Sequence, residues 1–234
     1  MSKVLVITGA SRGIGFATAQ LFAEKDFTIF NLSRSPSSAA NIHNVEVDFG
    51  GNDWQSTVTS TLLPAIAKAE QVVLVHNAAA NIRDSLLEFS VDDFRRVLEI
   101  NLVAPAQLSH LLLPQMRAGS SIIYVGSTLG EIAVPNSCAY VTSKHALIGL
   151  MRSTCQDLAG TGVHTACVCP GFTDTEMLRQ HVGNSEEVLQ SLAAGVTQKR
   201  LIQPSEIART VYFCADNAVI SGAVIHANLG QIQS

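Results

Sequence analysis

A tyrosine and a lysine stand four residues apart in the stretch Tyr140-Val141-Thr142-Ser143-Lys144. At this spacing the two side chains share one face of a helix, so that a phenol and an ammonium group come close together. An unperturbed tyrosine titrates at about pH 10, and nearby positive charge favours its phenolate. The pair therefore suggests a residue that gives and takes a proton at a reacting oxygen. An amphipathic surface helix is the alternative that the spacing alone leaves open.

A glycine-rich turn follows the first apolar run, with the sequence Thr8-Gly9-Ala10-Ser11-Arg12-Gly13-Ile14-Gly15. Glycines let the backbone turn tightly and approach a pyrophosphate, and the helix that follows offers free N–H groups and a partial positive charge. The turn lies between a strand and a helix, as a dinucleotide-binding turn requires. The predicted cofactor contacts here are Gly9, Ser11, Arg12, Gly13, Ile14 and Gly15. A plain strand–helix connection is the alternative.

The end of the second predicted strand, Thr28–Leu32, indicates which dinucleotide binds. A protein that binds NAD places Asp or Glu about 20 residues beyond the glycines, where it binds the adenosine ribose hydroxyls. No acidic residue occurs in this strand or in the three residues after it. The hydroxyl of Ser33 and the guanidinium groups of Arg34 and Arg12 instead suit a 2′-phosphate, so NADP(H) is the predicted cofactor. Two solvated arginines without a ligand are the alternative.

Short β-branched runs alternate with longer helical patterns, which is typical of βαβ units and a mostly parallel sheet. The predicted strands are Val4–Thr8, Thr28–Leu32, Val45–Asp48, Val72–His76, Ser121–Gly126, His164–Cys169 and Ala223–His226. The predicted helices are Ile14–Lys25, Trp54–Lys68, Val91–Arg117, Cys138–Ala159, Thr175–Gln198 and Pro204–Asp216. We expect one α/β domain over residues 1–234, a Rossmann-type doubly wound parallel sheet of about seven strands with helices on both faces.

Two helical segments should be irregular. Pro105 should bend or divide the helix Val91–Arg117, because proline removes one helical N–H and clashes with the preceding turn. The stretch 176–200 is polar and the least regular part of the chain, and it follows the part of the sequence where we expect the nicotinamide to bind. We therefore predict that it forms a lid over the site.

The sequence resembles the short-chain dehydrogenase/reductase family from Lys3 to Gly230. The resemblance rests on the glycine turn and on four further features in the family's order and spacing. These are Asn101, Ser127 after a predicted strand, the Tyr140/Lys144 pair, and the stretch Pro170-Gly171-Phe172-Thr173-Asp174-Thr175. Each motif is weak alone, but together they indicate one family.

This resemblance implies a role for each member of a catalytic set. Tyr140 would donate its proton to a carbonyl oxygen, and Ser127 would hydrogen-bond that oxygen and orient the substrate. Lys144 would hold the nicotinamide ribose hydroxyls. Asn101, near the irregularity expected at Pro105, would anchor a water that links Lys144 to solvent. A helix cap and a strand-end hydroxyl are the structural alternatives for Asn101 and Ser127.

The resemblance also implies further cofactor contacts. Asp48 and Phe49 match the adenine contacts of the family, and Asn77 and Ala78 would line the adenosine side. The nicotinamide carboxamide would be held by residues of the loop after the sixth strand, namely Pro170, Gly171, the Thr173 backbone and the Thr175 side chain. Two stretches depart from the family pattern. They are His76-Asn77-Ala78-Ala79, where Asn-Asn-Ala-Gly is usual, and Ala227-Asn228-Leu229-Gly230, where Asp-Gly-Gly is usual.

Composition limits the partners and the location of the protein. Of the 234 residues, 47% are hydrophobic and 15% charged, and the net charge of −4 provides no basic field for nucleic acid or an anionic membrane. The first apolar run is too short for a signal peptide, and no apolar run reaches the roughly 18 residues of a membrane span. We therefore expect a cytoplasmic protein with free thiols.

Two further expectations follow from residue content. Cys167 and Cys169 could suggest a metal pair, but they lie on a predicted strand without a further His/Cys cluster, so no metal site is expected. The apolar excess in the segments Asn101–Arg117 and Cys138–Ala159 exceeds what one sheet face needs. It predicts a homotetramer or a homodimer formed through these two segments.

The predicted function is NADP(H)-dependent hydride transfer between a nicotinamide and a ketone, an aldehyde or a secondary alcohol, with Tyr140 as acid and base. A free small-molecule substrate is favoured, because Ala159-Gly160-Thr161-Gly162 has no basic residue to complement Arg117 in binding an acidic carrier protein. A 3-oxoacyl-[acyl-carrier-protein] reductase remains an alternative. So do a catalytically silent dinucleotide-binding scaffold and an epimerase or dehydratase that recycles its bound cofactor, which would not consume NADPH stoichiometrically.

Overall fold

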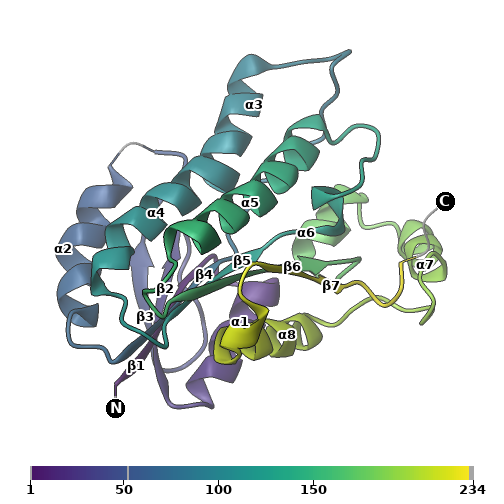
Figure 1. The fold of residues 1–234 in the computed structure, drawn as a ribbon. Coiled ribbons are helices and arrows are strands. Elements are labelled where there is room, and N and C mark those ends of the chain that lie inside the picture. Colours follow the sequence, from purple (N-terminus) through teal and green to yellow (C-terminus); the bar gives the residue numbers. More distant parts are fainter. Residues whose placement is uncertain (1, 52, 232–234) are drawn as a thin grey trace.

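A seven-stranded parallel sheet forms the centre of the computed structural model, which describes residues 2–51 and 53–231 (Figure 1). The strands are β1 (Lys3–Thr8), β2 (Phe27–Ser33), β3 (Ile42–Glu46), β4 (Gln71–His76), β5 (Ser121–Val125), β6 (His164–Pro170) and β7 (Ala223–Ala227). Their order is β3-β2-β1-β4-β5-β6-β7, and every neighbouring pair is parallel. This arrangement confirms the predicted doubly wound sheet.

Helices cover both faces of this sheet (Figure 1). One face packs against α1 (Gly13–Ala23) and α8 (Pro204–Asp216). The other packs against α2 (Trp54–Ile66), α4 (Ala104–Leu112) and α5 (Cys138–Asp157). In β1, for example, Leu5 and Ile7 belong to the first core and Val4 and Val6 to the second. Because both faces are buried, the inner strands read as continuous apolar runs.

The strand order creates a crevice between β1 and β4. The chain leaves β1 toward β2 on one side and leaves β4 toward β5 on the other, so the connections diverge at the carboxyl ends of these two neighbouring strands. In open α/β sheets ligands bind at this point, outside the carboxyl ends of the strands. The fold therefore brings the loops after β1, β4, β5 and β6 to one edge of the sheet.

The strand β3 lies earlier in the chain than the predicted Val45–Asp48. It pairs Ile42–Glu46 with Ile29–Ser33 of β2. As an edge strand it carries polar, exposed residues, and the side-chain amide of Asn31 donates to the Asn44 side chain at 2.9 Å. These polar residues concealed the first half of the strand. The side chain of Asp48 then accepts from the backbone N–H of Gly50 at 3.0 Å, in a turn beyond the strand.

The predicted helix Val91–Arg117 is divided, but the division precedes Pro105. The segment consists of α3 (Val91–Leu98), a π-helical turn at Glu99–Val103, and α4, in which Pro105 lies in the first turn. The N–H of Ala104 bonds to the carbonyl of Glu99, five residues back, which widens the helix. Proline is tolerated in a first helical turn, so the irregularity falls in the residues before it.

The stretch Val91–Gln115 is also, by length and hydropathy, long and apolar enough to cross a membrane. Core helices of soluble proteins pass the same test. Leu108 and Leu112 of this stretch have no exposed surface and pack in the core beneath α2 and α5.

The predicted helix Thr175–Gln198 is two short helices, α6 (Glu176–His181) and α7 (Glu186–Ala194). Gly183 and Asn184 separate them with backbone φ angles of 66° and 57°, which a helix cannot contain. The hydroxyls of Thr175 and Ser185 accept from backbone N–H groups of the first turns of α6 and α7 and so begin each helix. The stretch 176–200 is therefore less regular than predicted.

Candidate active site

The glycine turn after β1 places backbone, rather than side chains, at the crevice. Gly9 and Gly13 have φ angles of 71° and 59°, in the region that favours glycine. A Cβ on Gly15 would collide with the carbonyl oxygen of Gly9 and the side-chain amide of Asn77, and one on Gly9 would lie 3.1 Å from the Cα of Ala78. The first turn of α1 contains no acidic side chain. This cradle fits an anionic pyrophosphate.

The end of β4 fixes the glycine turn from the side. The side-chain amide of Asn77 donates to the carbonyls of Thr8 and Gly9, at 3.0 and 2.9 Å. The hydroxyl of Thr8 accepts from the backbone N–H groups of Asn77 and Ala78, at 3.0 and 2.9 Å. Asn77 therefore helps to build the turn as well as lying beside it, and no pattern along the chain predicts this role.

The residues predicted for the adenosine 2′-phosphate lie at the end of β2 and in the glycine turn. The hydroxyl of Ser33 donates to the carbonyl of Ser35 at 2.5 Å, and Arg34 is exposed. Arg12 also lies at the surface, but its guanidinium forms an ion pair of 2.7 Å with Glu176, the first residue of α6. Arg12 thus links the glycine turn to the predicted lid.

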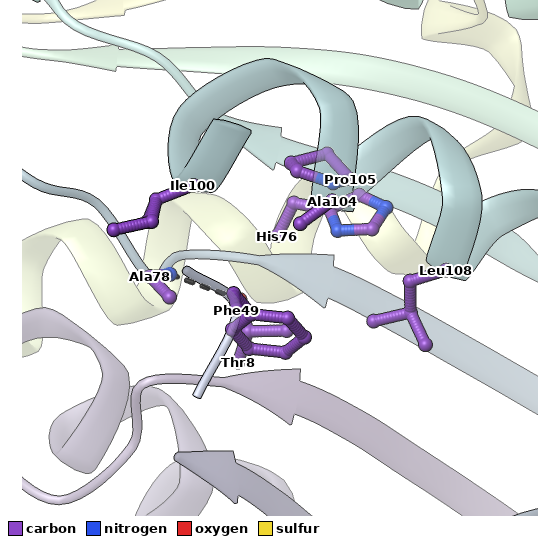
Figure 2. Close-up of a pocket in the computed structure, with 8 residues that line it drawn as sticks. All are labelled: Thr8, Phe49, His76, Ala78, Ile100, Ala104, Pro105 and Leu108. Atoms are coloured by element: carbon purple, nitrogen blue, oxygen red, sulfur yellow. Dashed lines mark hydrogen bonds between the residues drawn. The ribbon is translucent and has the colours of Figure 1, made fainter. Parts of the chain in front are cut away.

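The predicted adenine contacts differ in exposure. Asp48 is exposed, whereas Phe49 is buried, with its ring 5.1 Å from that of Trp54 in an edge-on contact. Figure 2 shows a small pocket that Phe49 lines, with Thr8 close to Phe49 and with Ala78 and Ile100 at the left of the view. The remaining lining residues in Figure 2 are His76, Ala104, Pro105 and Leu108.

Tyr140 and Lys144 lie on successive turns of α5, at the active-site end of that helix. Tyr140 is half-buried, and Lys144 is 3% exposed. The ammonium group of Lys144 is 5.4 Å from the centre of the Tyr140 ring and donates to the carbonyl of Val125 at 2.8 Å. The structure therefore brings the phenol and the ammonium group together at the end of β5.

Ser127 and Asn101 complete the set from two other elements. Ser127 follows β5, and its Oγ accepts from the N–H of Leu129 at 3.1 Å, so its own proton points elsewhere. Asn101 lies in the π-helical turn and is 1% exposed. Its amide accepts from the N–H of Ala80 at 2.7 Å, donates to the carbonyl of Ala80 at 2.9 Å, and donates to the hydroxyl of Ser143 at 3.0 Å.

The loop after β6 also reaches the glycine turn. Pro170 ends β6, and a Cβ on Gly171 would lie 2.9 Å from the Cα of Asn228. Thr173 is buried and donates to the carbonyl of Gly171 at 3.0 Å. The methyl group of Thr175 lies 3.3 Å from where a Cβ on Gly13 would be, so this loop reaches the cradle.

The comparisons with known proteins agree with this geometry. The family profile described as short chain dehydrogenase matches residues 3–186. The chain belongs to the short-chain dehydrogenase family. It is an oxidoreductase that transfers a hydride between a nicotinamide cofactor and a carbonyl or alcohol group.

Individual relatives cover almost the whole of this dehydrogenase. Protein FixR of Bradyrhizobium diazoefficiens is 34% identical, over 98% of this chain and 86% of its own length. The 3-oxoacyl-[acyl-carrier-protein] reductase FabG of Vibrio cholerae is 32% identical, over 97% of this chain and 96% of its own. The ligand-free structure of Thermoplasma acidophilum aldohexose dehydrogenase superimposes with a TM-score of 0.90 at 29% identity, over 98% of this chain and 93% of that one.

The dehydrogenase departs from the family pattern at His76, which the fold accommodates as a neutral side chain. Its ring is 3% exposed, its Nε2 is 2.8 Å from the hydroxyl of Ser109, and the Tyr124 ring lies 4.9 Å away. Burial lowers the pKa of His76 to about 3. Because a buried imidazolium would be costly, His76 acts here as a packed core residue and not as a cation for the cofactor.

Cys167 and Cys169 lie against Gly126, the residue before Ser127. Their sulfur atoms are 3.8 Å apart, both side chains are fully buried, and a Cβ on Gly126 would collide with both sulfurs. Within residues 2–51 and 53–231, no three His, Cys, Asp or Glu side chains gather as metal ligands would. The pair fills the space beneath the Gly126–Ser127 backbone.

Proposed function

We propose that this dehydrogenase is an NADP(H)-dependent reductase of ketones and aldehydes, working reversibly, with Tyr140 as the catalytic acid and base. One observation carries the proposal. Tyr140 and Lys144 lie together at the carboxyl end of β5, the strand that Ser127 follows, on the same edge of the sheet as the glycine turn. A silent scaffold would have no use for a phenol and an ammonium group held together at this edge.

The residues of this chain supply proton transfer and orientation. The bound nicotinamide gives or takes the hydride at the carbonyl carbon. Tyr140 delivers its phenolic proton to the carbonyl oxygen, and the hydroxyl of Ser127 donates a hydrogen bond to that oxygen and fixes its position. The ammonium group of Lys144 lies 5.4 Å from the centre of the Tyr140 ring and supplies positive charge beside the reacting groups. The cofactor ribose hydroxyls would lie within reach of the same ammonium group.

Asn101 is proposed to act through its backbone carbonyl, because its side-chain amide is fully engaged with Ala80 and Ser143. In an α-helix this carbonyl would accept from the N–H four residues later, and that residue is Pro105, which has no N–H. The carbonyl can therefore accept from a water. Such a water would return a proton from solvent to Tyr140 by way of Lys144.

The cofactor would be held along the whole crevice. The backbone of Gly9, Ser11, Gly13, Ile14 and Gly15 would contact the pyrophosphate. On the adenosine side we place Ser33, Arg34, Asp48, Phe49, Asn77 and Ala78, and on the nicotinamide side Pro170, Gly171, Thr173 and Thr175. The close backbone approach that Gly9 and Gly15 permit at the carboxyl ends of β1 and β4 supports this placement.

The preference for NADP(H) over NAD(H) rests on Ser33, Arg34 and Arg12. A 2′-phosphate carries roughly −1.5 to −2 charges, and the two arginines offer donors where an acid would repel it. The hydroxyl of Ser33 would first have to leave the carbonyl of Ser35. Arg34 is exposed and ready for this contact. Arg12 is paired with Glu176, so the phosphate has to compete with a carboxylate for that guanidinium. Arg34 is therefore proposed as the main contact.

The substrate is proposed to be a free small molecule. The likeness to FabG of Vibrio cholerae favours a second candidate, reduction of a 3-oxoacyl group on acyl carrier protein. Against it, the turn after α5, residues 159–162, carries no basic side chain to pair with Arg117 in holding an acidic carrier. NADPH oxidation screened over diketones, quinones, aldehydes and 3-oxoacyl thioesters distinguishes the two substrates.

We propose a homodimer or a homotetramer. The exposed apolar surface that could form its interface is smaller than the apolar content of the two helical segments suggested. Leu108, Leu112, Leu147 and Ile148 are buried within the chain and contribute nothing to an interface. Several exposed apolar side chains lie instead in the loop before α3, at the first residue of α3 and in the π-helical turn. They are Leu86, Leu87, Phe89, Val91 and Val103. An exposed patch of this kind is typical of a subunit contact.

Replacing Tyr140 by Phe should abolish hydride transfer and leave NADPH affinity nearly intact, because only the proton donor is lost. General acid catalysis contributes roughly 10²- to 10⁴-fold, so kcat should fall by about that factor. Tyr212→Phe, which removes a hydroxyl from α8 on the opposite side of the sheet, is the matched control and should keep full activity. Activity of Tyr140→Phe within a few-fold of wild type would remove Tyr140 from the mechanism.

The wild-type protein should bind NADPH about 10- to 100-fold more tightly than NADH, since a charge-assisted hydrogen bond is worth about 1.5–3 kcal/mol. Nicotinamide fluorescence titration measures both dissociation constants. The double variant Ser33→Asp/Arg34→Ala should reverse the preference. Glu176→Gln, which frees Arg12, should tighten NADPH a few-fold and leave NADH unchanged, because an exposed ion pair is worth at most about 1 kcal/mol. Equal or tighter binding of NADH by the wild type contradicts the assignment.

Light scattering at micromolar concentration should give the mass of a dimer or a tetramer. The variant Leu87→Asp places a charge on a side chain that is 95% exposed in the single chain, and should shift the mass toward the monomer. Val219→Asp, at a side chain that is 91% exposed beside β7, is the comparison for the effect of charge alone. A monomeric wild type would refute the proposed assembly.

A further inference from the structure

The loop after β4 is bonded to the first turn of α5, the helix that carries Tyr140. Both carboxylate oxygens of Asp84 accept from the backbone N–H of Ala139, at 2.9 and 3.2 Å. The carbonyl of Asp84 accepts from the N–H of Cys138 at 3.4 Å, and its N–H donates to the carbonyl of Asn136 at 3.2 Å. One residue thus satisfies two of the N–H groups that a helix leaves without partners in its first turn.

The Asp84 carboxylate takes the place of an N-cap side chain, which α5 lacks. The N-cap residue of α5, Ser137, makes no side-chain hydrogen bond to the helix, whereas Ser90 caps α3 with its own hydroxyl. Ala139 is fully buried, so its N–H has no access to water. Without the Asp84 carboxylate this N–H would lose its partner, and the first turn would have to move or unwind to find another.

The other end of the same loop is held by the catalytic set. Ala80 is bonded through both its N–H and its carbonyl to the amide of Asn101. Residues 80–84 therefore form a short tie between the π-helical turn and the start of α5. Tyr140 directly follows the residue that this tie holds, so the position of its phenol depends on where the first turn is fixed.

We propose that Asp84 is a positioning residue, which fixes the first turn of α5 through the Ala139 N–H and so places the Tyr140 hydroxyl for proton transfer. The proposal rests on the proposed function of Tyr140. Its requirement is an acceptor oxygen at this distance, not a charge. Asn at this position can provide that oxygen, Ala cannot, and Glu carries it on a longer side chain.

The test compares Asp84→Ala, Asp84→Asn and Asp84→Glu, with 2,3-butanedione and acetoacetyl-coenzyme A as the carbonyl substrates. In Asp84→Ala kcat should fall by about 10- to 100-fold, because a displacement on the order of 1 Å can cost about 100-fold. KM and the NADPH dissociation constant should stay within about threefold. Asp84→Asn should restore kcat to within about threefold of wild type, and Asp84→Glu should fall between the two.

Amide hydrogen exchange provides a readout that does not depend on turnover. Exchange in a peptide covering residues 138–141 should accelerate in Asp84→Ala and return to the wild-type rate in Asp84→Asn. Ser90→Ala, which removes the cap of the neighbouring helix α3, is the matched control: it should destabilise the protein similarly while leaving kcat and exchange at residues 138–141 unchanged. If Asp84→Ala does not fold, kcat and the exchange rate at residues 138–141 are measured on Asp84→Glu instead.

The proposal is overturned if kcat in the impaired variant stays within about threefold of wild type, or if Ser90→Ala lowers kcat as much. It is also overturned if exchange at residues 138–141 is unchanged. Failure of the proposed function gives a different result: the wild type then reduces neither substrate. The exchange experiment still reports in that case whether Asp84 anchors the helix.

Discussion

The active-site end of the sheet depends on the hydrogen bonds of one buried amide, that of Asn101. Its oxygen accepts from the N–H of Ala80, and its nitrogen donates to the carbonyl of Ala80 and to the hydroxyl of Ser143. These bonds join the loop after β4, the π-helical turn and α5. Because every polar atom of the amide has a partner, the network is rigid and specifies one arrangement of the three elements.

A second constraint is the close approach of backbones where β1 and β4 end. The hydroxyl of Thr8 accepts from two successive N–H groups, and the side chain of Asn77 donates to two successive carbonyls. The polar groups of both strand ends are thereby satisfied within the protein, and Gly9 and Gly15 let the two strand ends approach each other more closely than a Cβ would allow. The result is a rigid edge that carries the free N–H groups and the positive dipole end of α1, the kind of edge that attracts an anionic pyrophosphate.

Much of the fold could be predicted because burial leaves a pattern in the sequence. The inner strands are apolar on both faces, and the reactive residues recur in an order and spacing that the family shares. The predicted elements were wrong where the hydrophobic pattern is weak. The edge strand β3 is exposed and polar, and Gly183 and Asn184 interrupt a helix by their backbone conformation rather than by their hydropathy. The two short helices α6 and α7 could not be placed from composition.

Other parts of the site left no signal that could be read along the chain. Asp84 binds a backbone N–H that lies 55 residues away, and every residue except proline offers such a group. Likewise, the pairing of Arg12 with Glu176 depends on the route of the loop after β6. These contacts arise from the way the sheet gathers its loops. They also hold the residues of the site in place relative to one another.

A hydride should pass directly between a nicotinamide and a carbonyl carbon at this edge of the sheet. NADPH deuterated at both positions of C4 tests this transfer, with 2,3-butanedione as the acceptor and mass spectrometry of the product. We expect one deuterium on the former carbonyl carbon of the alcohol for each NADPH consumed. An alcohol without deuterium, or turnover of a substrate without net consumption of NADPH, would rule out direct hydride transfer.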